Sequence, residues 1–144
     1  MLSQTAQYAL RAVLYLAARD SRDDLVKIDE IADELRMPRN SLSKTLHALG
    51  RAGVLASTRG PSGGFRLAVA PDRLTLARVV APFDTIGQRD RQCILGRSTC
   101  SDAKPCTAHD SWKTVSQRVH GFFSDTTVAD MLHDASVARL RTTR

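Results

Sequence analysis

The chain has 144 residues, 42% of them hydrophobic, which is enough for one compact domain with a single core and an additional helix. Its 21 lysines and arginines outnumber its 15 aspartates and glutamates, and the net charge of +6 favours a polyanionic partner. No apolar run approaches the roughly 18–20 residues of a membrane span, and residues 1–17 lack the basic leader of a signal peptide, so we expect a cytoplasmic protein with reduced thiols and no membrane partner.

The first half of the chain predicts a helix-turn-helix. Apolar residues recur at helical spacing over 4–18, and a short helix over 28–35 has acids on one side and apolar residues on the other. Arg36-Met37 is a tight turn, and Pro38 suits the first position of a third helix that runs to about Arg51. Two short helices joined by a tight turn, the second one basic on its outer face, are typical of helix-turn-helix DNA-binding domains.

A basic window without compensating acids marks the expected DNA face. Residues 36–71 contain six lysines and arginines and no aspartate or glutamate. Such a window is an electrostatic footprint for nucleic acid. We expect the side chains on the outer face of the third helix to contact solvent or double-stranded DNA: Arg39, Asn40, Ser41, Ser43, Lys44, His47 and Arg51. His47 is equally well explained as a phosphate contact or as an ordinary exposed residue.

A β-hairpin is predicted after the third helix. Val54-Leu55 and residues 65–67 are short strands around the turn at 59–64, and a hairpin in this place is a wing. Arg59 lies at its tip beside Gly60, which permits close approach of the backbone. Arg59 is either a plain surface arginine or a residue that inserts into a narrow minor groove.

The second half predicts two further helices before a short C-terminal one. Thr75 would cap a helix from Leu76 to about Phe83, and residues 107–123 form a longer helix. Thr127 and Asp130 resemble a capping box, and the basic tail 138–144 is expected to be frayed. The longer helix has an apolar stripe that we interpret as a dimer core: Trp112, Val115, Val119, Phe122 and Phe123.

All three cysteines of the chain lie in one loop rich in turn formers. Cys93, Cys100 and Cys106 are separated by six and five residues, and His109 follows three positions later. Thiols and an imidazole in one loop are typical of a metal or iron–sulfur site. A tetrahedral zinc site, a thiol or disulfide switch without metal, and inert structural thiols remain as alternatives, as does a water-facing His109. No general base is placed beside the thiols, so we do not expect an enzyme.

The assembled motifs resemble the IscR/NsrR-type family of bacterial winged-helix repressors, which read iron–sulfur status, nitric oxide or redox stress. The likeness covers nearly the whole chain, and its most specific parts are the glycine-rich wing and the cysteine loop. It rests on these pieces: Tyr8-Ala9-Leu10 with Leu14, Ile31-Ala32 with Leu35, Leu49 with residues 52–55, Arg59-Gly60-Pro61, residues 63–67, and the three cysteines with His109 and Trp112.

The resemblance implies a homodimer with crossed long helices and a cluster in the loop, either 2Fe–2S or 4Fe–4S, although some members have none. In IscR-like members the fourth ligand is a histidine at the position of His109. In NsrR-like and related members it can be a carboxylate from the first helix of the other subunit. Here that position appears as Gln7, a poor iron ligand, which favours His109. If His109 were not a ligand, Tyr8 of the partner's first helix would be the next candidate.

We therefore expect a mainly α fold with a small β wing, a winged helix-turn-helix followed by a C-terminal dimerisation helix. The expected divisions are a DNA-binding domain at 1–84, a cluster-binding loop at 85–109, and a dimerisation helix and tail at 110–144. The expected function is a transcriptional regulator, most simply a repressor, controlled by a 2Fe–2S cluster bound to Cys93, Cys100, Cys106 and His109. A cluster-free thiol or disulfide sensor and a structural zinc protein are the alternatives.

Overall fold

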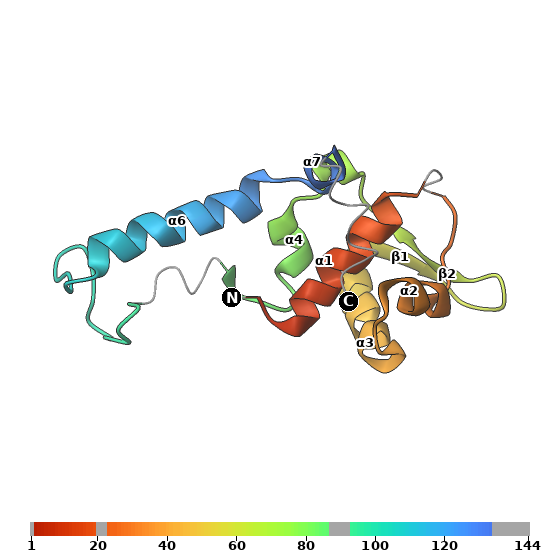
Figure 1. Cartoon of the computed structure of the whole chain (residues 1–144), viewed down its shortest axis with the longest axis horizontal. Coiled ribbons are helices and arrows are strands. Elements are labelled where there is room, and N and C mark those ends of the chain that lie inside the picture. The colour runs from red at the N-terminus through yellow and green to blue at the C-terminus, as the bar shows by residue number, and fades with distance from the viewer. Residues whose placement is uncertain (1, 20–22, 87–92, 134–144) are drawn as a thin grey trace.

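A computed structural model describes residues 2–19, 23–86 and 93–133 of the chain. A helical head carries a two-stranded wing, and one long helix extends from the head to the side (Figure 1). This arrangement confirms the predicted mainly α fold with a small β wing. The elements in chain order are α1 (Gln4–Ala17), α2 (Ile28–Leu35), α3 (Arg39–Arg51), β1 (Leu55–Thr58), β2 (Gly64–Leu67), η1 (Pro71–Arg73), α4 (Leu76–Val80), α6 (His109–Asp125) and α7 (Val128–His133).

Helix α1 runs through the centre of the head. Its first turn is capped by Ser3, whose hydroxyl accepts a hydrogen bond from the Ala6 N–H at 3.2 Å. Ala6, Ala9, Ala12 and Val13 are fully buried. Small side chains on this face let α3 and α4 approach closely, so the head closes around α1.

The helix-turn-helix is built from α2 and α3, and α2 has the predicted bounds. Arg36 takes a left-handed conformation with φ of 51°, and the Met37 N–H then bonds the Ala32 carbonyl at 2.9 Å. Arg11 of α1 donates to the Leu35 carbonyl at 2.8 Å, which ties the turn to the central helix. Pro38 is the N-cap residue of α3 rather than its first helical residue.

The wing is fixed to the head at its base. β1 and β2 pair antiparallel, with Leu55 opposite Leu67, and β1 begins one residue later than predicted and runs further, to Thr58. Val26 adds a short bridge to Phe65, with both backbone hydrogen bonds at 2.9 Å. Gly64 fits under this bridge because a Cβ atom there would lie 2.6 Å from the Val26 carbonyl oxygen.

The long helix is attached to the head at its C-terminal end. Phe123 of α6 is 5% exposed and Val128 of α7 is fully buried, and both belong to the core of the head. Thr127 and Asp130 form the predicted capping box, with reciprocal hydrogen bonds of 2.8 and 3.1 Å. α4 ends at Val80, earlier than predicted, because Ala81 and Pro82 close it. The tail 138–144 lies outside the described residues, whose helices include none long and apolar enough to span a membrane.

Candidate metal centre and nucleic-acid interface

The three cysteine sulfurs converge at the free end of α6. Although the cysteines are spread over fourteen positions, from Cys93 to Cys106, their Sγ atoms all lie within 4.8 Å of one another. Cys93 Sγ and Cys106 Sγ are 3.6 Å apart. Two sulfur ligands of one tetrahedral metal are about 3.8 Å apart when each metal–sulfur bond is about 2.3 Å. The spacing of these two thiols therefore fits shared coordination.

His109 completes this group from the first turn of α6. Its Nδ1 atom lies 3.2 Å from Cys100 Sγ, and its side chain is 16% exposed. The backbone N–H of His109 donates to the Cys106 carbonyl at 3.1 Å, so the last cysteine and the start of the helix form one turn. The structure thus brings together all four predicted ligands, with the Cys93–Cys106 pair on one side and the Cys100–His109 pair on the other.

Hydrogen bonds and burial within the loop give the thiols different pKa values. Backbone N–H groups at Arg97 and Leu95 lower the pKa of Cys93 to about 7, with Arg97 as the larger cause. Burial raises the pKa of the Cys100 thiol. Cys93 therefore becomes a thiolate, the form that binds metals and reacts with oxidants, more readily than Cys100 does.

A carboxylate that was not predicted from the sequence contacts His109. Asp102 Oδ1 accepts hydrogen bonds from His109 Nε2 at 2.9 Å and from Lys113 Nζ at 2.7 Å. The Lys113 ammonium first, and then His109, hold the pKa of the Asp102 carboxyl below its usual range. Asp102 lies seven residues before His109 on an irregular loop, so no periodic pattern could have pointed to it.

The four candidate ligands line a cavity of about 580 Å³ that continues along α6. Ile94, Trp112, Ser116 and His120 also contribute to its walls. Soft thiolates on a loop with room between them are the donor set that iron–sulfur clusters use. The residues present therefore fit a small iron–sulfur cluster.

The residues predicted to meet DNA lie on α3 and the wing, at the other end of the molecule from the cysteine loop (Figure 1). Most of them are exposed, whereas Ser43 is half-buried. Arg39 forms an ion pair with Asp29 of α2, and the His47 ring packs edge-on against Phe65 of β2 at 5.6 Å between centroids. His47 therefore supports the wing as well as facing solvent.

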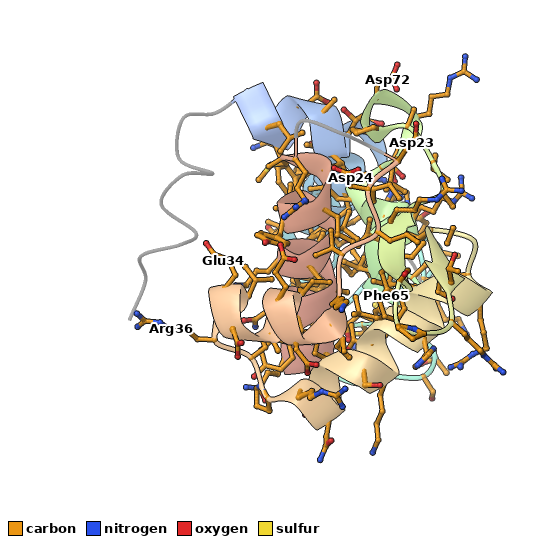
Figure 2. The ribbon with its side chains drawn as sticks, turned by 90° about the vertical axis from the view of Figure 1, so that its right-hand side faces the viewer. Asp23, Asp24, Glu34, Arg36, Phe65 and Asp72 are labelled. Atoms are coloured by element: carbon orange, nitrogen blue, oxygen red, sulfur yellow. The ribbon has the colours of Figure 1, made fainter. Side chains whose placement is uncertain are left out.

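Three acidic side chains of the head lie far from α3, whereas Asp29 of α2 lies beside it. Figure 2 places Asp23, Asp24 and Asp72 at the end of the head opposite α3, and Phe65 between the wing and the helices. Arg59 and Gly60 are exposed in the loop between β1 and β2, and Gly60 has φ of 104°. Residues 36–71 contain no acid, so the surface of α3 and the wing is basic, apart from Asp29 of α2, which pairs with Arg39.

The alternative fourth ligands lie on α1, where both have local partners. The Gln7 amide donates to the Leu2 carbonyl at 3.1 Å, and the Tyr8 hydroxyl accepts from the Gln4 amide at 3.1 Å. Neither residue lines the cavity of the cysteine loop within this chain. His109 is the imidazole that the described part of the chain places against the sulfurs.

Comparisons with known proteins find similar chains among transcriptional regulators. Residues 2–134 match the Rrf2 family model, described as an iron-dependent transcriptional regulator. A protein of Aquifex aeolicus named as an HTH-type transcriptional regulator is 37% identical over 135 residues, which is 92% of each chain. The HTH-type transcriptional regulator IscR of Photobacterium profundum is 28% identical over 139 residues, 96% of this chain and 79% of that one.

Two solved structures share the fold. CymR, the global cysteine regulator of B. subtilis, superposes with a TM-score of 0.78 at 21% identity, over 92% of this chain and 96% of that one. IscR of T. potens superposes with a TM-score of 0.72 at 23% identity, over 96% and 90%. Because the family model spans nearly the whole chain, the protein belongs to the Rrf2 family of transcriptional regulators.

Proposed function

We propose that this Rrf2-family regulator is a homodimeric repressor whose affinity for double-stranded DNA depends on an iron–sulfur cluster held by Cys93, Cys100, Cys106 and His109. The observation that carries the proposal is the convergence of three sulfurs within 4.8 Å, with the His109 Nδ1 atom 3.2 Å from Cys100 Sγ. Inert structural thiols would have no reason to gather beside an imidazole in a loop at the surface.

The pairing of the ligands favours a 2Fe–2S cluster over a 4Fe–4S cluster. In a 2Fe–2S cluster each iron takes two protein ligands, whereas each iron of a 4Fe–4S cluster takes one. The 3.6 Å spacing of Cys93 and Cys106 suits two ligands of one iron, and Cys100 with His109 supplies a second close pair. When bound, such a cluster supplies reversible electron transfer and sensitivity to oxidants.

The DNA-binding surface consists of the exposed face of α3 and the wing loop. Ser41 and Lys44 are exposed on α3, whose width suits the major groove. Arg59 extends from a wing whose base is held by the Val26–Phe65 bridge, so its approach to an adjacent minor groove is defined. The other proposed contacts are Arg39, Asn40, Ser43, His47, Arg51 and Gly60.

A second copy of the chain is proposed to cover the outer face of α6. Val115 and Phe122 are 51% and 52% exposed and stand seven residues apart, the spacing of a helix–helix seam. Val119 packs against the core of its own head, so the proposed seam differs from the predicted stripe. A two-fold dimer would place two α3 helices on one face, where successive major grooves lie about 34 Å apart.

The chain itself links the cysteine loop to the heads. His109 begins α6, and the far end of α6 is joined to the core by Phe123 and to α4 by the Thr75–Thr127 bridge. A change in how Cys106 and His109 are held would therefore tilt α6 relative to the head. In a dimer joined through α6, that tilt changes the separation of the two α3 helices and hence the DNA affinity.

The decisive experiment compares loaded and metal-free protein. We expect protein purified without oxygen to be coloured, to contain iron and acid-labile sulfide, and to lose both in Cys106→Ser, while the loop variant Ser98→Ala keeps both. DNA affinity is then measured by fluorescence anisotropy on a duplex selected from a random library. Colourless protein that holds zinc without sulfide would contradict the proposal. A cytoplasmic location, where thiols stay reduced, is part of it.

One alternative function has a specific observation in its favour. Cys93 and Cys106 lie 3.6 Å apart between sulfurs, and Cys93 has the lowered pKa, so oxidation could join them in a disulfide without a cluster. In that case the protein would bind no iron, and DNA affinity would follow the Cys93–Cys106 disulfide. Mass spectrometry of oxidised and reduced protein, paired with the same anisotropy assay, separates the two functions.

A further inference from the structure

One carboxylate oxygen is shared by two donors next to the proposed cluster site. Asp102 Oδ1 accepts from His109 Nε2 at 2.9 Å and from Lys113 Nζ at 2.7 Å. His109 and Lys113 are four residues apart, so they face the same side of α6. The loop residue Asp102 is thereby attached to the helix at two points, both beside the ring that contacts Cys100.

The chemistry of these groups selects one form of the imidazole. An ionised carboxylate is an acceptor only, so the His109 Nε2 atom that faces Asp102 must carry the proton. In the neutral ring the other nitrogen, Nδ1, then has a free lone pair. That lone pair faces the sulfurs, because Nδ1 is the atom 3.2 Å from Cys100 Sγ.

We propose that Asp102 is a positioning residue that holds His109 with its proton on Nε2 and its Nδ1 lone pair aimed at the metal site. The role of His109 as a ligand rests on the proposed function, but the tautomer is a property of the metal-free chain. Lys113 supports this arrangement by holding the shared Asp102 oxygen in place. Ligand histidines elsewhere commonly donate their second N–H to a carboxylate, which orients the ring and raises its basicity.

The exposure of the pair sets the expected size of the effect. The Asp102 side chain is 74% exposed and that of His109 is 16% exposed, so water competes for the carboxylate but less for the ring. Loss of such an outer partner elsewhere lowers metal affinity by about 10- to 100-fold. Because Asp102 is largely solvated, we expect the lower end, about tenfold.

The first test reads the tautomer in metal-free, reduced protein labelled with ¹⁵N-histidine. The spectrum is recorded well above the pH at which free imidazole titrates, and His109→Ala assigns the signals. In the wild type we expect a protonated Nε2 and a bare Nδ1, with the Nε2 proton protected from exchange. Asp102→Ala should admit the other tautomer and lose the protection. A wild-type proton on Nδ1, or an unchanged spectrum in Asp102→Ala, would overturn the proposal.

The second test asks whether Asp102 acts through His109. Co²⁺ is titrated into reduced protein, and its absorption bands report affinity and ligand set. Asp102→Ala should weaken binding about tenfold, and should have no further effect in a His109→Ala background. The control is Asp110→Ala, which removes the same charge from the residue next to His109.

The outcomes of the two tests separate the positioning role from the proposed function. Equal losses from Asp102→Ala in both backgrounds would show that Asp102 acts by charge or loop folding and would overturn its positioning role. Protein that binds neither cobalt nor a cluster, yet has the Asp102-dependent tautomer, would overturn the proposed function and support the placement of His109.

Discussion

Thr75 and Thr127 are paired as an isolated antiparallel bridge, one immediately before α4 and the other immediately before α7. The Leu76 N–H bonds the Thr126 carbonyl at 3.0 Å, and the Val128 N–H bonds the Leu74 carbonyl at 2.8 Å. These two hydrogen bonds join the end of α6 to the DNA-binding head. The cysteine loop lies at the opposite end of α6, so the helix is attached to the head at one end and to the cysteine loop at the other.

Dimerisation should depend on the exposed seam of α6. Replacing Val115 and Phe122 with glutamate places like charges at a seven-residue spacing, and we expect the variant to sediment as a monomer. The control is Gln117→Glu, because a residue two positions along the helix from Val115 points to the opposite side. A double variant that still sediments as a dimer would require a different interface.

DNA affinity should fall steeply with salt, because phosphate contacts release counterions. Lys44→Ala should reduce the slope of log affinity against log salt by about one if Lys44 neutralises one phosphate. Arg73→Ala is the matched control, since Arg73 follows Asp72 at the end of the head away from α3 (Figure 2). The measurement is anisotropy at several salt concentrations, and equal slopes in all three proteins would remove Lys44 from the interface.

Arg59 should contribute base-dependent affinity rather than a uniform contact. If it enters a narrow minor groove, Arg59→Ala weakens binding most on sites with an A·T-rich flank, where the groove potential is most negative. The comparison uses two duplexes that share the central site and differ in the flanks. An equal loss on both duplexes would make Arg59 a phosphate contact.

Two glycines of the head should respond to alanine in opposite directions. In Gly64→Ala the new Cβ would meet the Val26 backbone at 2.6 Å, which strains the base of the wing, and we expect destabilisation and weaker DNA binding. Gly50 lies within α3, and its nearest neighbour to a Cβ is the Leu55 oxygen at 3.9 Å. Gly50→Ala should therefore stabilise the protein by about 0.5–1 kcal/mol. Urea unfolding measures both, and stabilisation by Gly64→Ala would contradict the packing at Val26.

The thiols of metal-free protein should differ in reactivity with pH. Because backbone hydrogen bonds lower the pKa of Cys93 to about 7, its thiolate forms above that pH and disappears below it. Alkylation by iodoacetamide should therefore be half-maximal near pH 7 at Cys93, whereas Cys100 should react only at higher pH because burial raises its pKa. Peptide mass spectrometry gives each rate, and identical profiles at the two residues would refute the difference.

Local signals predicted the elements whose ends are set by neighbouring residues. The apolar face of residues 28–35 predicted α2 with its observed bounds, and the Thr127–Asp130 spacing predicted the capping box because both partners lie within one turn. The extension of β1 to Thr58 was not predicted, since its pairing with Gly64 arises across the hairpin rather than along the strand.

Contacts within the cysteine loop were predicted only in part. The four proposed ligands were predicted from residue type and order, and the structure brings them together. Asp102 was missed because its contacts with His109 and Lys113 depend on how an irregular loop folds back on α6. A one-dimensional pattern has no period for such a contact, so only the three-dimensional arrangement could supply it.

Trp112 is the single tryptophan of the chain, and its side chain lines the same cavity as Cys93, Cys100 and Cys106. Its fluorescence therefore originates beside the cysteines and nowhere else in the protein. A bound chromophore that absorbs near the indole emission would quench this light, and loss of the chromophore would restore it. The chain thus contains its own optical reporter, with which loading and release can be followed in real time without an attached dye.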